Sequence, residues 1–289
     1  MKNIFLLFFI IGALQVKGQS KSYDYCYVNK KGSICVYSVA DNKEYPVVIT
    51  MGDAPSISSD GRKVAYTASN KKGERFIAVI DLNTKKKIIF NTSSNNCYGP
   101  VWSPDGKFIA YNVFNDQTSK WSIAVIDSSN TAPKILTAQL EESFMPTWTY
   151  DSKNVVVQNM QNVYVINLSG SLINTYKISD MTKDIGPTSS DRFIFTNDNK
   201  KIVFSSEADE PGWSSGPPTA VFIYDIAGKS TLRLSPKGYF ANDIIIKGNK
   251  VLFTSSKNKS PVQNIFSVDM DGKNLKIMFP NCSEVSARD

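Results

Sequence analysis

The absence of histidine restricts the chemistry of this 289-residue chain more than any residue that is present. Ser-His-Asp and Cys-His nucleophilic systems, histidine general bases and histidine-ligated zinc sites therefore cannot be built from its residues. Carboxylates remain as candidates for acid–base chemistry. Glu141 and Glu142 are adjacent in a segment between predicted strands, and a pair of carboxylates can cleave a glycosidic bond.

A second group of candidates consists of aromatic and acidic residues that interrupt an otherwise regular repeat. The longest interruption is the segment 207–218. Aromatic and carboxylate side chains in loops of this kind commonly form binding sites, and interface anchors are typically Trp and Tyr. The predicted binding residues are Trp213, Trp121, Tyr98, Phe144, Tyr239, Phe240, Glu207, Asp209 and Glu210.

An internal repeat indicates which elements must position these residues. Five segments share a small strand, a polar turn and a more apolar strand, as in 55–66 and 100–111. Each is followed by a further apolar strand and a short last strand, so the unit is four strands over about 46 residues. We expect the turn aspartates to be structural. The turn residues are Asp60, Asp105, Asp151, Asp198 and Lys247, at intervals of 45, 46, 47 and 49.

Four-stranded units at this period predict the blades of a β-propeller, because one small sheet cannot bury both of its faces alone. Residues 23–50 supply three strands of a first blade but no innermost strand, and the tail Cys282–Asp289 stands where a further innermost strand would begin. We therefore expect an all-β, six-bladed β-propeller of four-stranded antiparallel blades. The C-terminal strand is expected to close the ring by joining the first blade.

The string Trp102-Ser-Pro-Asp-Gly-Lys107, followed by Phe-Ile-Ala-Tyr, resembles the WD40-like Ser-Pro-Asp-Gly repeat of the TolB-like six-bladed β-propeller family. It is also similar to propellers of the prolyl oligopeptidase and dipeptidyl peptidase group. The resemblance implies a six-bladed ring, a location in the cell envelope and contacts with other proteins. Neither the extra N-terminal domain of TolB nor a hydrolase domain is expected in this chain, so partners and peptidase activity do not carry over.

The predicted function is a non-catalytic module, without a cofactor, that binds an envelope or surface protein as a monomer. The candidate face carries the inter-blade links and the loops between second and third strands. The aromatic residues could instead plug a channel mouth, and the alternative function is a glycan-active or carbohydrate-binding propeller. A sialidase-like site needs a cluster of arginines, and the sequence has only five arginines in all. A calcium-like site needs oxygen ligands at a spacing that the sequence lacks. The five arginines are Arg62, Arg75, Arg192, Arg233 and Arg288.

The N-terminus predicts export. Residues 1–18 combine a basic start, an apolar run from Ile4 to Leu14 and small residues before Gln19, which is typical of a secretory signal peptide. Residues 19–289 then form one propeller domain in the periplasm or outside the cell, without a lipid anchor or transmembrane segment. The net charge of +7 arises from scattered lysines, so nucleic-acid binding is not expected.

The chain has four cysteines, and export permits disulfides. Cys26 and Cys35 flank the turn Asn29-Lys30-Lys31-Gly32. A symmetric hairpin centred on this turn places the two residues directly opposite each other, at a Cα separation that a disulfide accepts. We therefore expect a Cys26–Cys35 disulfide, whereas the pairing of Cys97 and Cys282 stays open.

Overall fold

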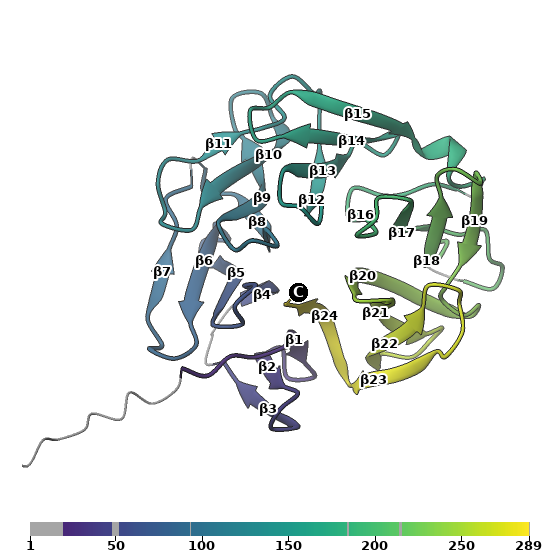
Figure 1. The fold of residues 1–289 in the computed structure, drawn as a ribbon, viewed down its shortest axis with the longest axis horizontal. Coiled ribbons are helices and arrows are strands. Elements are labelled where there is room, and N and C mark those ends of the chain that lie inside the picture. The colour runs from purple at the N-terminus through teal and green to yellow at the C-terminus, as the bar shows by residue number, and fades with distance from the viewer. Residues whose placement is uncertain (1–19, 48–51, 93, 184, 214–215, 289) are drawn as a thin grey trace, which may run out of the picture.

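The computed structural model describes residues 20–47, 52–92, 94–183, 185–213 and 216–288. These residues form six sheets of four antiparallel strands, arranged as blades around a common centre (Figure 1). The all-β, six-bladed propeller predicted from the repeat is confirmed. The predicted signal peptide, residues 1–18, lies outside the described residues.

Each blade has its innermost strand at the centre of the ring. Innermost strand first, blades one to three contain β24 (Cys282–Ala287), β1 (Tyr25–Asn29), β2 (Ile34–Ser38), β3 (Lys43–Pro46); β4 (Gly52–Ile57), β5 (Lys63–Ser69), β6 (Arg75–Asp81), β7 (Lys87–Ile89); and β8 (Cys97–Trp102), β9 (Phe108–Asn115), β10 (Lys120–Asp127), β11 (Lys134–Ile135). Blades four to six contain β12 (Phe144–Trp148), β13 (Asn154–Gln158), β14 (Asn162–Asn167), β15 (Leu172–Lys177); β16 (Phe193–Phe195), β17 (Lys201–Glu207), β18 (Thr219–Asp225), β19 (Ser230–Arg233); and β20 (Tyr239–Lys247), β21 (Lys250–Lys257), β22 (Gln263–Asp269), β23 (Lys276–Pro280). A 3-10 turn, η1 (Ile178–Asp180), follows β15.

The repeated aspartates hold the turns between first and second strands. In the third blade, the Ser103 hydroxyl donates to Asp105 Oδ1 over 2.7 Å, and the Lys107 N–H donates to the same oxygen over 3.1 Å. The same pair of bonds is formed at the turns of Asp60, Asp151 and Asp198. A Ser or Thr two residues before the aspartate is therefore part of the repeat, and these bonds give the aspartates the structural role that the sequence predicts.

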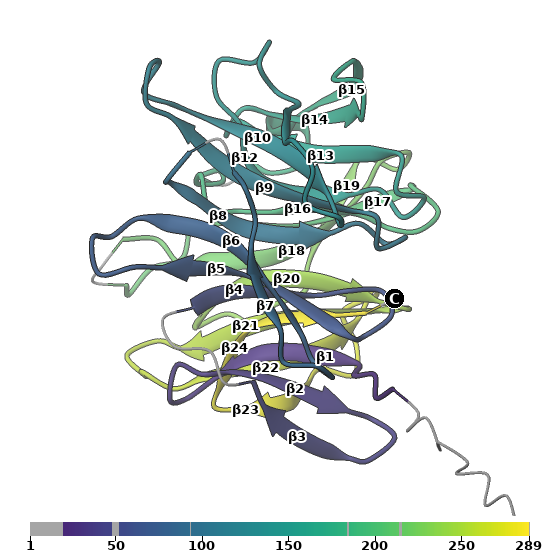
Figure 2. The ribbon, with the colours of Figure 1, turned by 90° about the vertical axis from the view of Figure 1, so that its left-hand side faces the viewer.

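The ring is closed by non-local pairing. β24, at the C-terminal end, forms the innermost strand of the first blade and pairs antiparallel with β1. The Arg288 guanidinium then contacts Asp24 at 2.7 Å and donates to the Ser22 hydroxyl. Figure 2 shows the C-terminal end on the same side of the ring as the described N-terminal segment. The predicted closure is thus confirmed.

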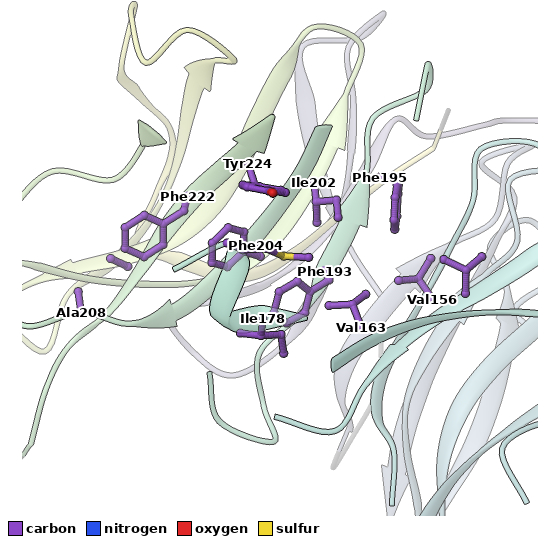
Figure 3. Packing of buried hydrophobic residues seen from close by; sticks show 13 residues of the cluster. Val156, Val163, Ile178, Phe193, Phe195, Ile202, Phe204, Ala208, Phe222 and Tyr224 are labelled. Atoms are coloured by element: carbon purple, nitrogen blue, oxygen red, sulfur yellow. The ribbon is translucent and has the colours of Figure 1, made fainter. Parts of the chain in front are cut away.

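The core lies between neighbouring blades, because alternate residues of a strand point to opposite faces of its sheet. On β5, Val64 and Tyr66 pack toward the first blade, whereas Ala65 packs toward the third. Between the fourth and fifth blades, Figure 3 shows Val156 and Val163 facing a group that includes Phe193 and Phe204. Each blade thus needs its neighbours to bury both of its faces.

The expected Cys26–Cys35 disulfide is wrong. Asn29 pairs with Ser33 around a three-residue turn that ends at Gly32, whose φ is +70°. This odd turn length shifts the register by one residue, so Cys26 lies opposite Val36 and Cys35 opposite Tyr27. A one-residue shift puts the two cysteines on opposite faces of the sheet. Both thiols are buried and free, as are those of Cys97 and Cys282.

The described residues include no helix of the length and apolarity that a membrane crossing would require.

Candidate functional site

An aromatic cluster lies on the predicted face, beside the loop that joins β9 to β10. The rings of Tyr98 and Trp121 meet edge to face with centroids 5.0 Å apart. Phe114, at the end of β9, lies 5.0 Å from Trp121 on a tilted approach. All three side chains are partly exposed. The structure therefore brings together two of the predicted residues and adds a third that the sequence did not single out.

Arg75 joins this cluster from the neighbouring blade. Its guanidinium carbon lies 4.4 Å from the centroid of Tyr98 and 5.6 Å from that of Trp121. Asn96 fixes the guanidinium by accepting bonds from Nε at 2.9 Å and from Nη2 at 2.6 Å. A guanidinium stacked on aromatic rings is attracted by their quadrupoles. We call Arg75, Tyr98, Phe114 and Trp121 the aromatic cluster.

The acidic loop 207–213 is tied to the link between the fifth and sixth blades. Glu210 forms an ion pair with Arg233 at 2.8 Å and accepts a bond from the Gly238 N–H. Burial acts to raise the pKa of Glu210, but the Gly238 N–H and the Arg233 guanidinium outweigh it and hold that pKa below its usual range. Glu210 therefore anchors its own loop, which is a structural task that the sequence did not predict.

The other predicted residues have different surroundings. Trp213 is half-buried beside Glu210, and Asp209 is exposed. Tyr239 packs edge to face on Phe266 at 6.0 Å, and Phe144 is only 5 % exposed. Phe144 is thus a core residue, which leaves it little surface to offer a partner.

Most of these residues are at the ends of strands, not in loops. Tyr98 belongs to β8, Phe144 to β12, and Tyr239 and Phe240 to β20, so each innermost strand begins earlier than the repeat suggests. Trp121 and Glu207 are in β10 and β17, respectively. Only Asp209, Glu210 and Trp213 lie between strands.

The adjacent carboxylates proposed as an acid–base pair serve local contacts. Glu141 is exposed and lies 3.3 Å from the Lys120 ammonium. Glu142 accepts a bond of 3.5 Å from the Trp121 N–H. No three Cys, Asp or Glu side chains within the described part of the chain converge in a way that could hold a metal ion.

Residues at one repeated position of the innermost strands form a central ring that the sequence reasoning missed. Each lies three residues before the last or next-to-last residue of an innermost strand, such as Ile57 in β4 or Trp102 in β8, and Arg192 directly precedes β16. Five of the six have a positive φ, and a β-bulge or register shift accompanies each of these. Members of the central ring are Ala54, Gly99, Met145, Arg192, Asp243 and Glu284.

The bulges are held from the preceding blade. The Gly99 N–H donates to Thr67 Oγ1 at 3.0 Å, and the Met145 N–H donates to Asn112 Oδ1 at 2.9 Å. The carboxylate of Glu284, in the first blade, accepts a hydrogen bond of 2.6 Å from the Ala54 N–H, in the second blade. Polar side chains of the preceding blade, on its second strand for Gly99 and Met145 and on its innermost strand for Ala54, therefore fix the central ring.

One half of the central ring is charged and the other half is small or apolar. Burial lowers the pKa of Arg192, while the nearby Asp243 and Glu284 carboxylates act to raise it. Burial also raises the pKa of Asp243, and it raises that of Glu284 to about 7 with a contribution from Asp243. The three charges interact across the centre, yet no ion pair within 4.0 Å joins Arg192 to either carboxylate.

Six four-stranded blades, closed by a C-terminal strand, define the class of the protein as a six-bladed β-propeller. No family model and no curated protein matches the sequence. Solved structures do match: TolB from Acinetobacter baumannii superposes with a TM-score of 0.65 at 18% identity, over 92% of this chain and 66% of that one. An Agrobacterium tumefaciens structure assigned to TolB gives 0.63 at 18% identity, over 90% of each chain.

Peptidase propellers share the fold at lower similarity. The puromycin-hydrolyzing peptidase of Mycobacterium tuberculosis matches with a TM-score of 0.57 at 12% identity, over 91% of this chain but 44% of that one. The chain therefore has the TolB-like six-bladed propeller fold. The same fold occurs in proteins with several functions, so the likeness does not itself assign one.

Proposed function

We propose that this protein is a non-catalytic module of the cell envelope that binds a protein partner through the aromatic cluster. The observation that supports the proposal is the stacking of Arg75 on Tyr98 and Trp121 in a partly exposed position. Trp, Tyr and Arg are the residues enriched among interface anchors. The location rests on the signal-like N-terminus and on the TolB-like fold.

The aromatic cluster suits a protein surface for two physical reasons. Its rings are held by one another and by Arg75, so little side-chain entropy remains to be lost on binding. Within the described residues, the guanidinium of Arg75 donates hydrogen bonds only to Asn96. Its remaining N–H groups can reach a carbonyl or carboxylate of the partner.

Trp213 belongs to the same proposal as a second anchor. It lies on the loop that Glu210 fastens to Gly238 and Arg233. A fastened loop presents its aromatic residue in a defined place, which lowers the cost of ordering on association. Asp209, exposed on the same loop, is proposed to favour a basic contact.

Substitution of the cluster tests the proposal. We expect Trp121→Ala to reduce capture of a partner from envelope extract at least ten-fold, because truncation of an interface hot spot costs about 2 kcal/mol or more. Trp213→Ala should have a smaller effect in the same direction. The control is Ile173→Ala, a change at an exposed apolar residue on the outermost strand β15.

Capture and thermal unfolding must be measured on the same preparations. The proposal predicts a loss of capture with a melting temperature only a few degrees lower. It is contradicted if the Trp121 and Ile173 variants capture equally well. It is equally contradicted if Trp121→Ala unfolds the ring while the folded fraction still binds, since the tryptophan would then be a plug.

A further inference from the structure

A second site lies at the opposite end of the ring from the aromatic cluster, among the turns between first and second strands. There a funnel with a cavity volume of about 130 Å³ opens at the centre, and all six innermost strands contribute to its wall. Its rim includes Tyr150 and Asn197, and its wall includes Ile57, Val101 and Ile245. We call this cavity the central funnel.

The wall of the central funnel is mostly apolar, and its charge has one sign. Of the residues that line it, only Arg192 and Arg288 are charged, and none is acidic. Arg288, at the rim, is already paired with Asp24 at 2.7 Å. Arg192, at the inner end, belongs to the central ring and has no such partner.

Arg192 has one buried N–H group without a partner in the described part of the chain. Its Nε is shielded from solvent and finds no hydrogen-bond partner among the described residues. A buried donor without a partner is costly, so an acceptor that reaches this N–H group is favoured. Asp243 and Glu284 are near enough to raise the pKa of Arg192, but neither of them lines the funnel.

We propose that the central funnel binds a carboxylate carried on a short apolar stem, with the carboxylate on Arg192. A guanidinium matches a carboxylate in a bidentate geometry. The stem would lie between Ile57, Val101, Ile194 and Ile245, which line the path to Arg192. The volume of about 130 Å³ is about ten times the minimum of roughly 10–15 Å³ that one buried water needs, so a stem of several carbons fits.

Two sources supply this chemistry, namely a short aliphatic acid and the last residue of a peptide with an apolar side chain. This inference does not depend on the proposed partner surface: Tyr98 of the aromatic cluster interacts electrostatically with Arg192, but no residue of that cluster lines the funnel. A test therefore needs one aliphatic acid, one peptide acid and the uncharged amide of each.

Isothermal titration calorimetry on the mature chain provides the test, with hexanoate and acetyl-Ala-Leu as probes. We expect saturable one-to-one binding of at least one of these carboxylates, and at least ten-fold weaker binding of the matching amide. Arg192→Met, which removes the guanidinium but keeps a flexible apolar side chain, should also weaken binding at least ten-fold. Arg62→Met is the matched control, since Arg62 is exposed on a turn of the same end and does not line the funnel.

A second variant covers the case in which Arg192→Met does not fold. Asn197 is exposed at the rim, so Asn197→Asp adds a negative charge without touching the core. It should weaken carboxylate binding several-fold and leave the melting temperature unchanged. Binding of neither probe, equal binding of acids and amides, or unchanged affinity in both the Arg192 and Asn197 variants would overturn the proposal.

Discussion

Glu284 brings a carboxylate into the strand that closes the ring. Its Oε2 accepts the Ala54 N–H of the neighbouring blade, and burial together with Asp243 raises its pKa from 4.5 to about 7. A group whose pKa is higher in the folded state binds more protons there than in the unfolded chain. Its contribution to stability is therefore complete below pH 4.5 and is lost as the pH rises toward 7.

We predict that the free energy of unfolding falls between pH 4.5 and 7.5, by about 3 kcal/mol from Glu284 alone. Glu284→Gln retains an oxygen acceptor for the Ala54 N–H but cannot ionise, so this variant should be the more stable one at pH 8. Urea unfolding at several pH values measures the difference. Glu141→Gln, at an exposed position, should follow the wild-type profile; an equally steep profile for Glu284→Gln would contradict the prediction.

At the level of single residues, the sequence predicts some roles correctly and others wrongly. The turn aspartates were predicted to be structural, and Asp105 is held by Ser103 and Lys107 as that role requires. The disulfide prediction failed because it assumed a symmetric turn, whereas Gly32 adopts φ +70° and adds an odd residue. The residue types predict the hydrogen bonds of a turn, but the pairing register of β1 and β2 depends on the backbone conformation of Gly32.

At the level of elements, blades dock through their turns as well as through their cores. The Tyr23 N–H donates to Gly61 O at 2.9 Å, which fastens the segment before β1 to the turn after β4. Gly61 has a φ of +68°, and a Cβ at this position would lie 2.3 Å from Tyr23 O. Only glycine therefore fits where the first and second blades meet.

Gly61→Ala is predicted to lower the melting temperature strongly, because the added Cβ meets backbone that cannot move without breaking the contact. Gly73→Ala is a matched control, since Gly73 also has a positive φ, of +80°, but nothing lies within 4 Å of a Cβ there. The control should cost about 1 kcal/mol from the backbone conformation alone. Equal losses in the two variants, by calorimetry, would contradict the steric explanation.

The innermost strands show what the repeat could not reveal. The sequence predicted their C-terminal halves well, since Trp102 and Trp148 recur at one position and Trp148 Nε1 donates to Val101 O of the preceding blade. The repeat predicts inter-blade links at their first residues, whereas these residues pair in the strands, because bulges at Gly99 and Met145 interrupt the alternation of side chains. The sequence also did not reveal the central ring, because its members share a place in the fold but no residue type.

At the scale of the whole molecule, the two ends of the ring differ in chemistry. One end carries the aromatic cluster and the acidic loop 207–213, and the other carries the central funnel, whose charged lining residues are arginines. Blade count and closure followed from the repeat and from the C-terminal tail. The aromatic cluster followed only in part, through Tyr98 and Trp121, because it also includes Arg75 of the second blade, which only the closed ring brings to Tyr98 of the third.

Site-specific photocrosslinking tests the central claim, partner binding through the aromatic cluster, most directly. A photoreactive phenylalanine analogue replaces Phe114, whose ring already lies in the aromatic cluster, in cells that export the protein. The same analogue at Ile173 on β15 probes the outer edge of the ring as a control. We predict one protein adduct of defined mass from position 114, absent from position 173 and lost when Arg75→Ala is added. Adducts of the same proteins from both positions, or none from position 114, would contradict the proposed function.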